Sequence, residues 1–167
     1  MKRKLNWFVG MAFVFLGEMS LAQTKVLSIP VEPHPNQLEL LESEDAQLHR
    51  NKQLVFDFYR IVLRGLRLDR AQEFLAQNYI QHNPNVPTGL EGFVRYFREV
   101  FGDRQNPIPS ELSNLVSIQA ERDMVTLSFV WAVRGEDGDI DYTTTWFDMF
   151  RIQDGKIAEH WDNDIKR

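Results

Sequence analysis

The sequence has 167 residues, of which 43% are hydrophobic and 26% are charged, and it contains no cysteine. This length suits one domain with a sizeable core, and the lack of cysteine excludes both disulfides and a lipid-modified cysteine anchor. The formal net charge is −5 at pH 7. Phosphate contacts need lysine and arginine gathered on one face, so this acidic chain without a basic cluster is expected to have no nucleic-acid partner.

The N-terminus has the layout of a secretory signal peptide. Residues 2–4 are basic, residues 5–16 are almost entirely apolar, and Ser20 and Ala22 place small side chains where signal peptidase reads the chain. The apolar run is shorter than the roughly 20 residues that a membrane span needs. We therefore expect cleavage between Ala22 and Gln23, a periplasmic or secreted protein, and no membrane contact after cleavage.

The rest of the chain divides into an arm and a domain. Residues 23–37 carry three prolines among polar residues, which is typical of an extended segment. Residues 38–167 then hold all of the periodic apolar patterns. We expect this second part to fold as a single domain.

Three helices are predicted in the first half of the domain. Apolar side chains recur at helical spacing over residues 38–66, and a shorter helix fits residues 69–77. Residues 78–87 contain two prolines and read as a loop. Thr88 is the candidate N-cap of a third helix over residues 90–101.

The apolar period changes from 3.6 to 2 in the second half, which indicates strands. Strands are predicted over residues 112–120, 124–134, 140–153 and 156–164, and Asp154-Gly155 is a strong hairpin signal. Helices followed by consecutive antiparallel strands are typical of the α+β class. A curved antiparallel sheet packed against three N-terminal helices would enclose an apolar pocket.

Asp148 is the most informative polar residue of these strands. It shares a strand face with bulky neighbours, which are Tyr142, Thr144, Trp146, Phe150 and Ile152. Burial disfavours the charged form of a carboxylate, so Asp148 is a candidate general acid/base. A structural aspartate satisfied by Tyr142 or by a loop amide is the other interpretation, and spacing alone leaves both open.

Two histidines are further candidates. His82 lies in the loop beside Asn83, where it could orient or protonate a substrate oxygen, or simply lie on the surface. His160 and Asp162 share a strand face and form either a hydrogen-bonded pair at the pocket mouth or a solvated strand end. These side chains with Asp148 could ligate a metal, but no pair has typical ligand spacing, so we expect no metal and no cofactor.

Two separated blocks resemble one known family. Residues 79–87, Tyr-Ile-Gln-His-Asn-Pro-Asn-Val-Pro, and residues 148–162 are similar to the SnoaL-like polyketide cyclases, and more narrowly to the group predicted to catalyse aldol condensations. The resemblance spans roughly residues 44–164. It implies the nuclear-transport-factor-two-like fold, a cone of curved sheet and helices that is often dimeric. It also implies aldol ring closure without cofactor or metal, with an aspartate at Asp148 as acid/base.

The resemblance implies a set of site residues. Asp148 and His82 are the expected catalytic residues. Substrate contacts are expected from Tyr79, Asn83, Phe129, Trp131, Trp146, Phe150, His160 and Asp162. Similar proteins often carry histidines where this chain has Phe129 and Trp131, and aromatic rings there would make the pocket drier but remove hydrogen-bond donors.

These observations give one leading hypothesis and one alternative. The first is an exported protein that binds a small, mostly apolar carbonyl compound and acts as an aldol-type cyclase or isomerase. The alternative is a non-catalytic small-molecule-binding or interaction module of the same fold. The outer sheet face around Phe147 and Met149 is a candidate homodimer interface.

Overall fold

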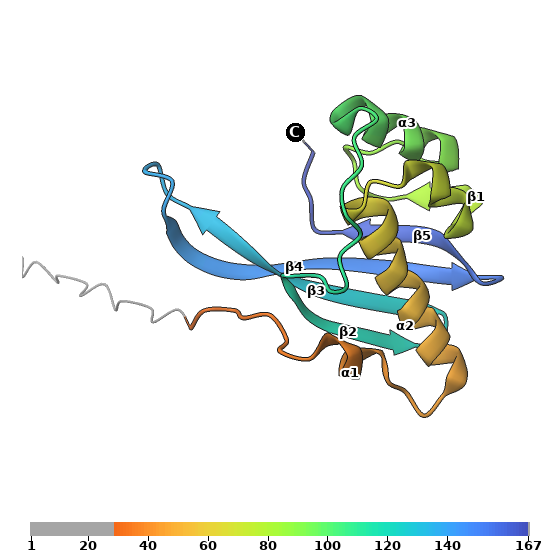
Figure 1. Ribbon diagram of the computed structural model, residues 1–167, viewed down its shortest axis with the longest axis horizontal. Helices are drawn as coiled ribbons and strands as arrows, with labels where there is room; N and C mark the ends of the chain where they lie inside the picture. Colours follow the sequence, from red (N-terminus) through yellow and green to blue (C-terminus); the bar gives the residue numbers. More distant parts are fainter. Residues whose placement is uncertain (1–28, 167) are drawn as a thin grey trace, which may run out of the picture.

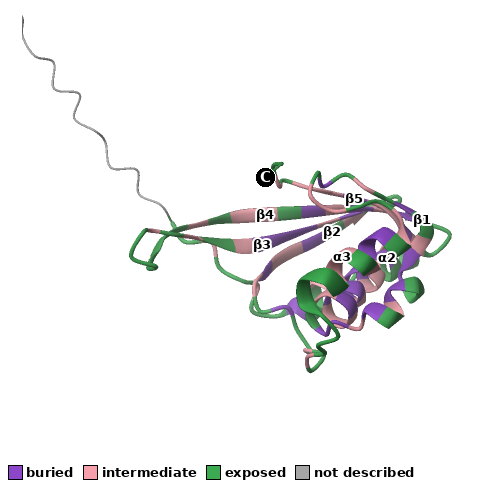
Figure 2. Ribbon diagram, turned by 90° about the horizontal axis from the view of Figure 1, so that it is seen from above, coloured by how far each residue is buried: buried purple, intermediate pink, exposed green. Residues whose placement is uncertain are grey.

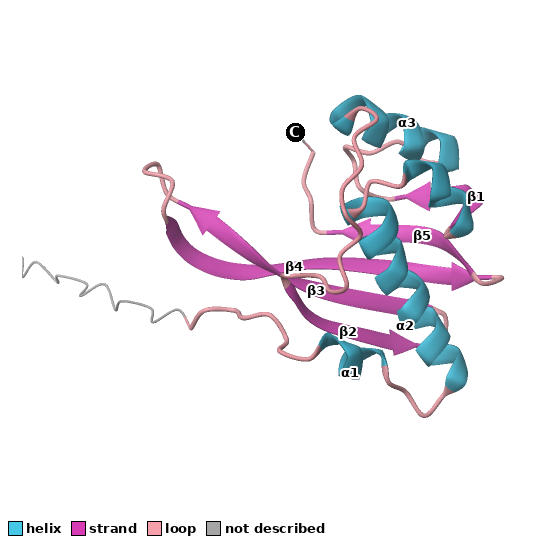
Figure 3. Cartoon of the chain, in the orientation of Figure 1, coloured by secondary structure: helices cyan, strands magenta, loops and turns pink. Residues whose placement is uncertain are grey.

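The computed structural model describes residues 29–166, so the predicted signal peptide and its cleavage site lie outside the described residues. Five strands form one sheet in the order β1-β5-β4-β3-β2 (Figure 1). The strands are β1 (Leu75–Gln81), β2 (Leu115–Glu121), β3 (Met124–Arg134), β4 (Ile140–Gln153) and β5 (Lys156–Asp162). The predicted α+β class is confirmed, with helices on one face of a curved sheet (Figure 3).

The first predicted helix is divided in two. A short α1 (Gln37–Leu41) precedes α2 (Ala46–Phe58), and the break falls where the Asp45 carboxylate accepts the backbone N–H groups of Gln47 and Leu48 at 2.6 and 3.1 Å. An N-cap of this kind satisfies donors that have no partner inside the helix. Helix α2 then continues into a π-helical turn (Tyr59–Arg64), a feature often found at functional sites.

The predicted helix over residues 69–77 is wrong. The chain forms a 3-10 helix (Leu68–Glu73) and then enters β1, which pairs in parallel with β5. Ala71, Phe74 and Leu75 are buried, as the helical pattern also required. Pairing with β5, a strand about eighty residues further along the chain, decides the conformation of this segment over its local pattern.

Helix α3 (Leu90–Phe101) has the predicted bounds, but its N-cap residue is Gly89 and not Thr88. The Thr88 hydroxyl instead donates to the carbonyl of Tyr79 at 3.1 Å and accepts the N–H of Gln81 at 3.0 Å. Thr88 therefore fixes the loop to β1, beside two side chains of the site described below.

Strands β3 and β4 also have the predicted bounds, and together with β2 and β5 they pair antiparallel. Asp154 and Gly155, between β4 and β5, have φ angles of 51° and 72°, as a tight hairpin turn requires. Beyond the helices, the β3–β4 hairpin projects away from the core and its side chains become exposed (Figure 2). Trp131 and Tyr142, on this hairpin, are 50% and 48% exposed.

The core lies between α2, α3 and the inner face of the sheet. Phe58 is at its centre, with ring centroids 6.1, 5.8 and 6.2 Å from those of Phe74, Phe93 and Phe150. Such aromatic contacts bury large apolar areas and fix the helices against the strands. Within residues 29–166, none of the helices combines the length and apolar character that a membrane crossing would need.

Candidate functional site

A cavity of about 160 Å³ lies between the helices and the inner face of the sheet. One part of its wall is apolar and consists of Phe58, Leu63, Val86, Phe93, Phe97 and Phe150. The other part is polar and is formed by β1, the loop after it, β4 and β5, with Tyr59 reaching in from the π-helical turn. A mostly apolar pocket with a few convergent polar groups is typical of a small-molecule site.

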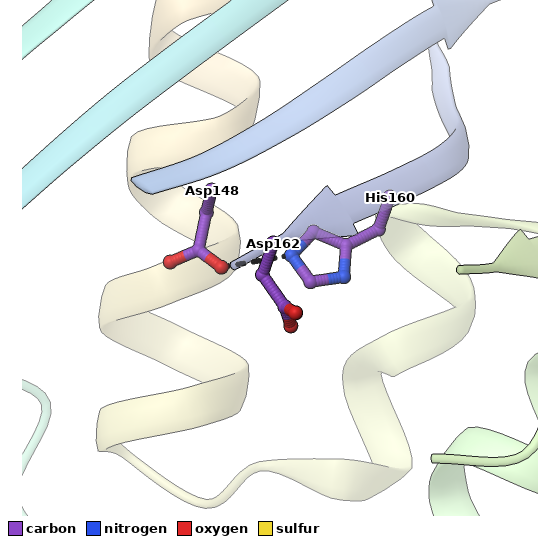
Figure 4. A group of neighbouring side chains, drawn as sticks. All are labelled: Asp148, His160 and Asp162. Carbon is purple, nitrogen blue, oxygen red and sulfur yellow. Dashed lines mark hydrogen bonds and ion pairs between the residues drawn. The ribbon is translucent and has the colours of Figure 1, made fainter. Parts of the chain in front are cut away.

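Asp148 is buried in this wall and takes part in three hydrogen bonds. The Tyr59 hydroxyl donates to Oδ2, the Trp146 indole N–H donates to Oδ1 at 3.2 Å, and His160 Nε2 lies 2.9 Å from Oδ1. Figure 4 shows Asp148 and His160 joined in this way, with Asp162 beside them. Tyr142, the partner considered from the sequence, is half exposed on the β3–β4 hairpin instead.

The orientation of Gln81 determines where the His160 ring carries its proton. Gln81 Oε1 accepts the backbone N–H of Asn83 at 2.9 Å, and a backbone N–H can only donate. The same oxygen lies 2.8 Å from His160 Nδ1. Because an acceptor faces Nδ1, this ring nitrogen must carry a proton.

The contact between His160 Nε2 and Asp148 Oδ1 therefore holds one proton. It lies either on Nε2, which gives an imidazolium and a carboxylate, or on Oδ1, which gives a neutral imidazole and a carboxylic acid. With no proton between them, two lone pairs would face each other at 2.9 Å. The two side chains form a pair that can deliver or accept a proton at the cavity wall.

Asp162 lies next to this pair but has other partners. Its Oδ2 accepts the side-chain amide of Asn83 at 2.6 Å, and its Oδ1 accepts the N–H of Asp164 at 3.0 Å. The His160–Asp162 hydrogen bond, one of the two interpretations of the sequence, is not formed, because both ring nitrogens of His160 contact Gln81 and Asp148. Asn83 and Asp162 both line the cavity.

Two buried tyrosines complete the polar wall. Burial raises the pKa of the Tyr59 hydroxyl well above its ordinary value, and the charge of Asp148 and the hydrogen bond to it raise that pKa further. Burial also raises the pKa of Tyr79, with smaller effects of Asp148 and Asp162. Both hydroxyls therefore stay protonated and are hydrogen-bond donors at any physiological pH.

His82 is not brought to the cavity. Its side chain lies on the other side of the sheet edge, with Nε2 3.1 Å from Glu159 Oε2 and its ring stacked on Trp161 at 4.6 Å. Strand parity explains this placement, because Glu159 and Trp161 alternate with His160 along β5 and point away from the core. The geometry gives His82 no contact with Asp148.

Phe129, Trp131 and Trp146 surround the site without lining the cavity. The Phe129 ring packs 4.9 Å from that of Tyr59, and the Trp131 ring packs 5.1 Å from that of Trp146. Phe129 is covered by Tyr59, while Trp131 lies where β3 has already left the helices. The rings of Phe129 and Trp131 thus support the donors to Asp148, and neither ring lines the cavity.

Two polar residues of the site, Tyr59 and Gln81, are not among the site residues predicted from the sequence. Tyr59 is adjacent to Phe58 in the helical stripe, but the π-helical turn that directs it toward Asp148 leaves no clear sequence signal. Gln81 is different, because it lies inside the family-like block of residues 79–87. The sequence analysis expected residues 78–87 to form a loop, so Gln81 was not predicted as a site residue. In the structure Gln81 ends strand β1, which places it beside His160.

Asp148, His160 and Asp162 offer ligand atoms within 4.8 Å of one another, close enough to hold a metal ion. The donors at Asp148 do not fit such a site well. Trp146 has no lone pair to offer a cation, and its N–H occupies Oδ1 together with His160. The arrangement suits a carboxylate held by hydrogen bonds better than a metal ligand.

Comparison of this chain with known proteins identifies the family to which it is similar. The sequence profile of the SnoaL-like domain matches residues 55–160. Among curated proteins, none matches the chain. Similar solved structures include an NTF2-like protein of unknown function from Burkholderia pseudomallei, at 16% identity and a TM-score of 0.49, with 68% of this chain and 89% of that chain covered.

Two further solved structures are similar to this chain in fold. A predicted polyketide cyclase from Acidithiobacillus ferrooxidans is 15% identical, with a TM-score of 0.47 and coverage of 72% of this chain and 89% of that chain. TsrD from Streptomyces laurentii is 23% identical, with a TM-score of 0.41 and coverage of 73% and 90%.

Proposed function

This chain belongs to the SnoaL-like domain family, and on that footing we propose that it binds a small, mostly apolar carbonyl compound and moves a proton on it. The observation that supports this most is the Asp148–His160 pair, which holds one proton at the wall of a cavity that is otherwise largely aromatic. A buried proton donor and acceptor beside an apolar ligand pocket is what proton transfer next to a carbonyl requires.

Asp148 has room for one more partner. A carboxylate has about four acceptor positions. Trp146 and His160 take those of Oδ1, and Tyr59 takes one of Oδ2. Among the described residues, none takes the remaining position on Oδ2, which leaves it for a hydrogen of the ligand.

The chemistry follows from this free position. Asp148 removes a proton from the carbon next to the carbonyl, which leaves an enolate and a carboxylic acid. Attack of the enolate carbon on a second carbonyl of the same molecule forms a carbon–carbon bond, and Asp148 returns its proton to the new alkoxide. Return of the proton to a different carbon of the enolate gives an isomerisation instead. Both reactions are redox-neutral, and a well-placed acid/base contributes about 10²- to 10⁴-fold to such steps.

The first test of this function is to identify what the protein binds. Native mass spectrometry on protein purified from its own cells, followed by extraction, should reveal a compact carbonyl compound. Turnover of that compound should fall by about 10²-fold or more in Asp148→Asn, which keeps the size of the side chain but loses the carboxylate. Full turnover by the variant would contradict the proposed role of Asp148.

A non-catalytic binding module remains the second candidate, and one observation favours it. Each described side-chain nitrogen and oxygen that is buried already has a hydrogen-bond partner, as in a purely structural polar network. In that case Asp148 and His160 would fix the shape of the pocket without exchanging protons with the ligand. The two candidates differ in whether hydrogens of a bound ketone exchange with solvent.

We also propose that the protein is exported and acts as a homodimer. The basic and apolar segments of residues 2–16 support export, and Gln23 would then be the first residue of the mature chain. N-terminal sequencing of the purified protein checks this, and an intact N-terminus in the mature protein would refute it. The exposed aromatic ring of Phe147 on the outer sheet face supports a dimer through β4.

A further inference from the structure

The Tyr79 hydroxyl has a proton that the described residues do not accept. Tyr79 lies on β1, is 2% exposed and lines the cavity. Its oxygen lies 3.1 Å from the Gln81 amide nitrogen Nε2. Whether the hydroxyl donates or accepts in that contact depends on the orientation of the Gln81 amide.

The neighbours of Gln81 fix this orientation. Its Oε1 faces the backbone N–H of Asn83, which can only donate, so the oxygen and nitrogen of the amide cannot be exchanged. The NH₂ group therefore points at Tyr79 and donates to its oxygen. Within residues 29–166, the structure offers no acceptor for the proton that the Tyr79 hydroxyl itself carries.

A buried hydroxyl proton without an acceptor is unfavourable, and a bound ligand oxygen would satisfy it. We propose that Tyr79 is the hydrogen-bond donor that binds the ligand's carbonyl oxygen in this cavity. This inference rests on the proposed ligand site, but it does not depend on any proton transfer by Asp148.

The size of the cavity narrows the ligand class. A cavity of about 150 Å³ lined by apolar side chains holds one benzene ring, and this cavity measures about 160 Å³. Its apolar wall is mostly phenylalanine, and Tyr79 contributes one donor to its polar wall. The site therefore fits a one-ring ligand with an acceptor oxygen, and an aryl methyl ketone is a suitable probe for it.

Two probes of nearly the same shape separate the hydrogen bond from apolar contact. Acetophenone has a carbonyl oxygen at the position where α-methylstyrene has a doubly bonded CH₂ group. The dissociation constants of both are measured with the wild-type protein and with Tyr79→Phe. We expect Tyr79→Phe to weaken acetophenone relative to α-methylstyrene by roughly 2- to 12-fold, the range that corresponds to one net hydrogen bond.

Tyr142→Phe is the matched control, because Tyr142 is half exposed on the β3–β4 hairpin, away from the cavity. This variant should leave the ratio of the two constants unchanged. A ratio that is the same in wild type and Tyr79→Phe would overturn the assignment of Tyr79. If neither probe binds to the wild type, both the assignment and the proposed ligand site fail.

An infrared measurement on the wild type keeps the proposal testable if Tyr79→Phe does not fold. The carbonyl stretch of bound acetophenone, labelled with carbon-13, should lie below its frequency in an alkane solvent, because a hydrogen bond weakens the C=O bond. An unshifted stretch would overturn the assignment. If the stretch is unshifted while bound ketone still exchanges hydrogens through Asp148, the Tyr79 inference fails and the proposed function stands.

Discussion

At the residue scale, Tyr59 and Tyr79 have different tasks although both are buried. Tyr59 donates to Asp148 and so helps to hold the carboxylate in place, whereas the proton of Tyr79 is available to a ligand. Burial raises the pKa of each hydroxyl above its ordinary value. Neither tyrosine is therefore a base in the proposed reaction, and Asp148 with His160 carries the proton transfer.

The raised tyrosine pKa values predict a loss of stability at high pH. Above about pH 10 the tyrosines of the unfolded chain release protons, while Tyr59 and Tyr79 keep theirs in the folded state. The unfolded state then binds fewer protons, so the free energy of unfolding falls as pH rises. Tyrosinate absorbance near 295 nm should be lower in native than in urea-unfolded protein, and equal absorbance at pH 11 would contradict the burial of these hydroxyls.

At the element scale, sequence periodicity predicts the elements that are determined locally. Strands β3 and β4 and helix α3 have the predicted bounds, because their apolar patterns are long and regular. The strand β1 could not be found in this way, since it exists through pairing with β5. Tyr59 was missed for a related reason: its partner Asp148 lies 89 residues away, and only the folded chain brings them together.

The division between α1 and α2 leads to a prediction about Asp45. Its carboxylate caps α2, so Asp45→Ala should lower the free energy of unfolding by about 1 kcal/mol in a urea titration. Asp103→Ala is a suitable control, because Asp103 is almost fully exposed in a turn, and a change within about 0.5 kcal/mol is expected there. Equal losses in the two variants would show that the cap does not determine where α2 begins.

At the scale of the whole molecule, the helices cover only part of the sheet. The β3–β4 hairpin extends beyond them (Figures 1 and 2). Strand parity places Phe147, which is 50% exposed, on the outer face of β4. This ring would be covered if two copies of the chain met through the outer face of β4. The cavity, in contrast, is lined by residues of the helices, the loop after β1 and the inner face of the sheet, so contact at the outer face would not cover it.

The proposed homodimer can be tested through this face. Phe147→Glu would place a charge in the interface, and light scattering should then give half the wild-type mass. Phe101→Glu is a control, because Phe101 is exposed at the end of α3, on the helical side of the sheet. A wild-type monomer, or an unchanged dimer mass in Phe147→Glu, would refute a dimer through this face.

The central claim is that Asp148 exchanges a proton with the carbon next to a bound carbonyl. Acetophenone in deuterium oxide tests it most directly, because its methyl hydrogens are replaced by deuterium only when an enol or enolate forms. Mass spectrometry should detect deuterium uptake with wild-type protein well above the uncatalysed rate, and background uptake with Asp148→Asn at concentrations where acetophenone still binds. Binding without uptake in the wild type, or equal uptake by the variant, would contradict proton transfer by Asp148.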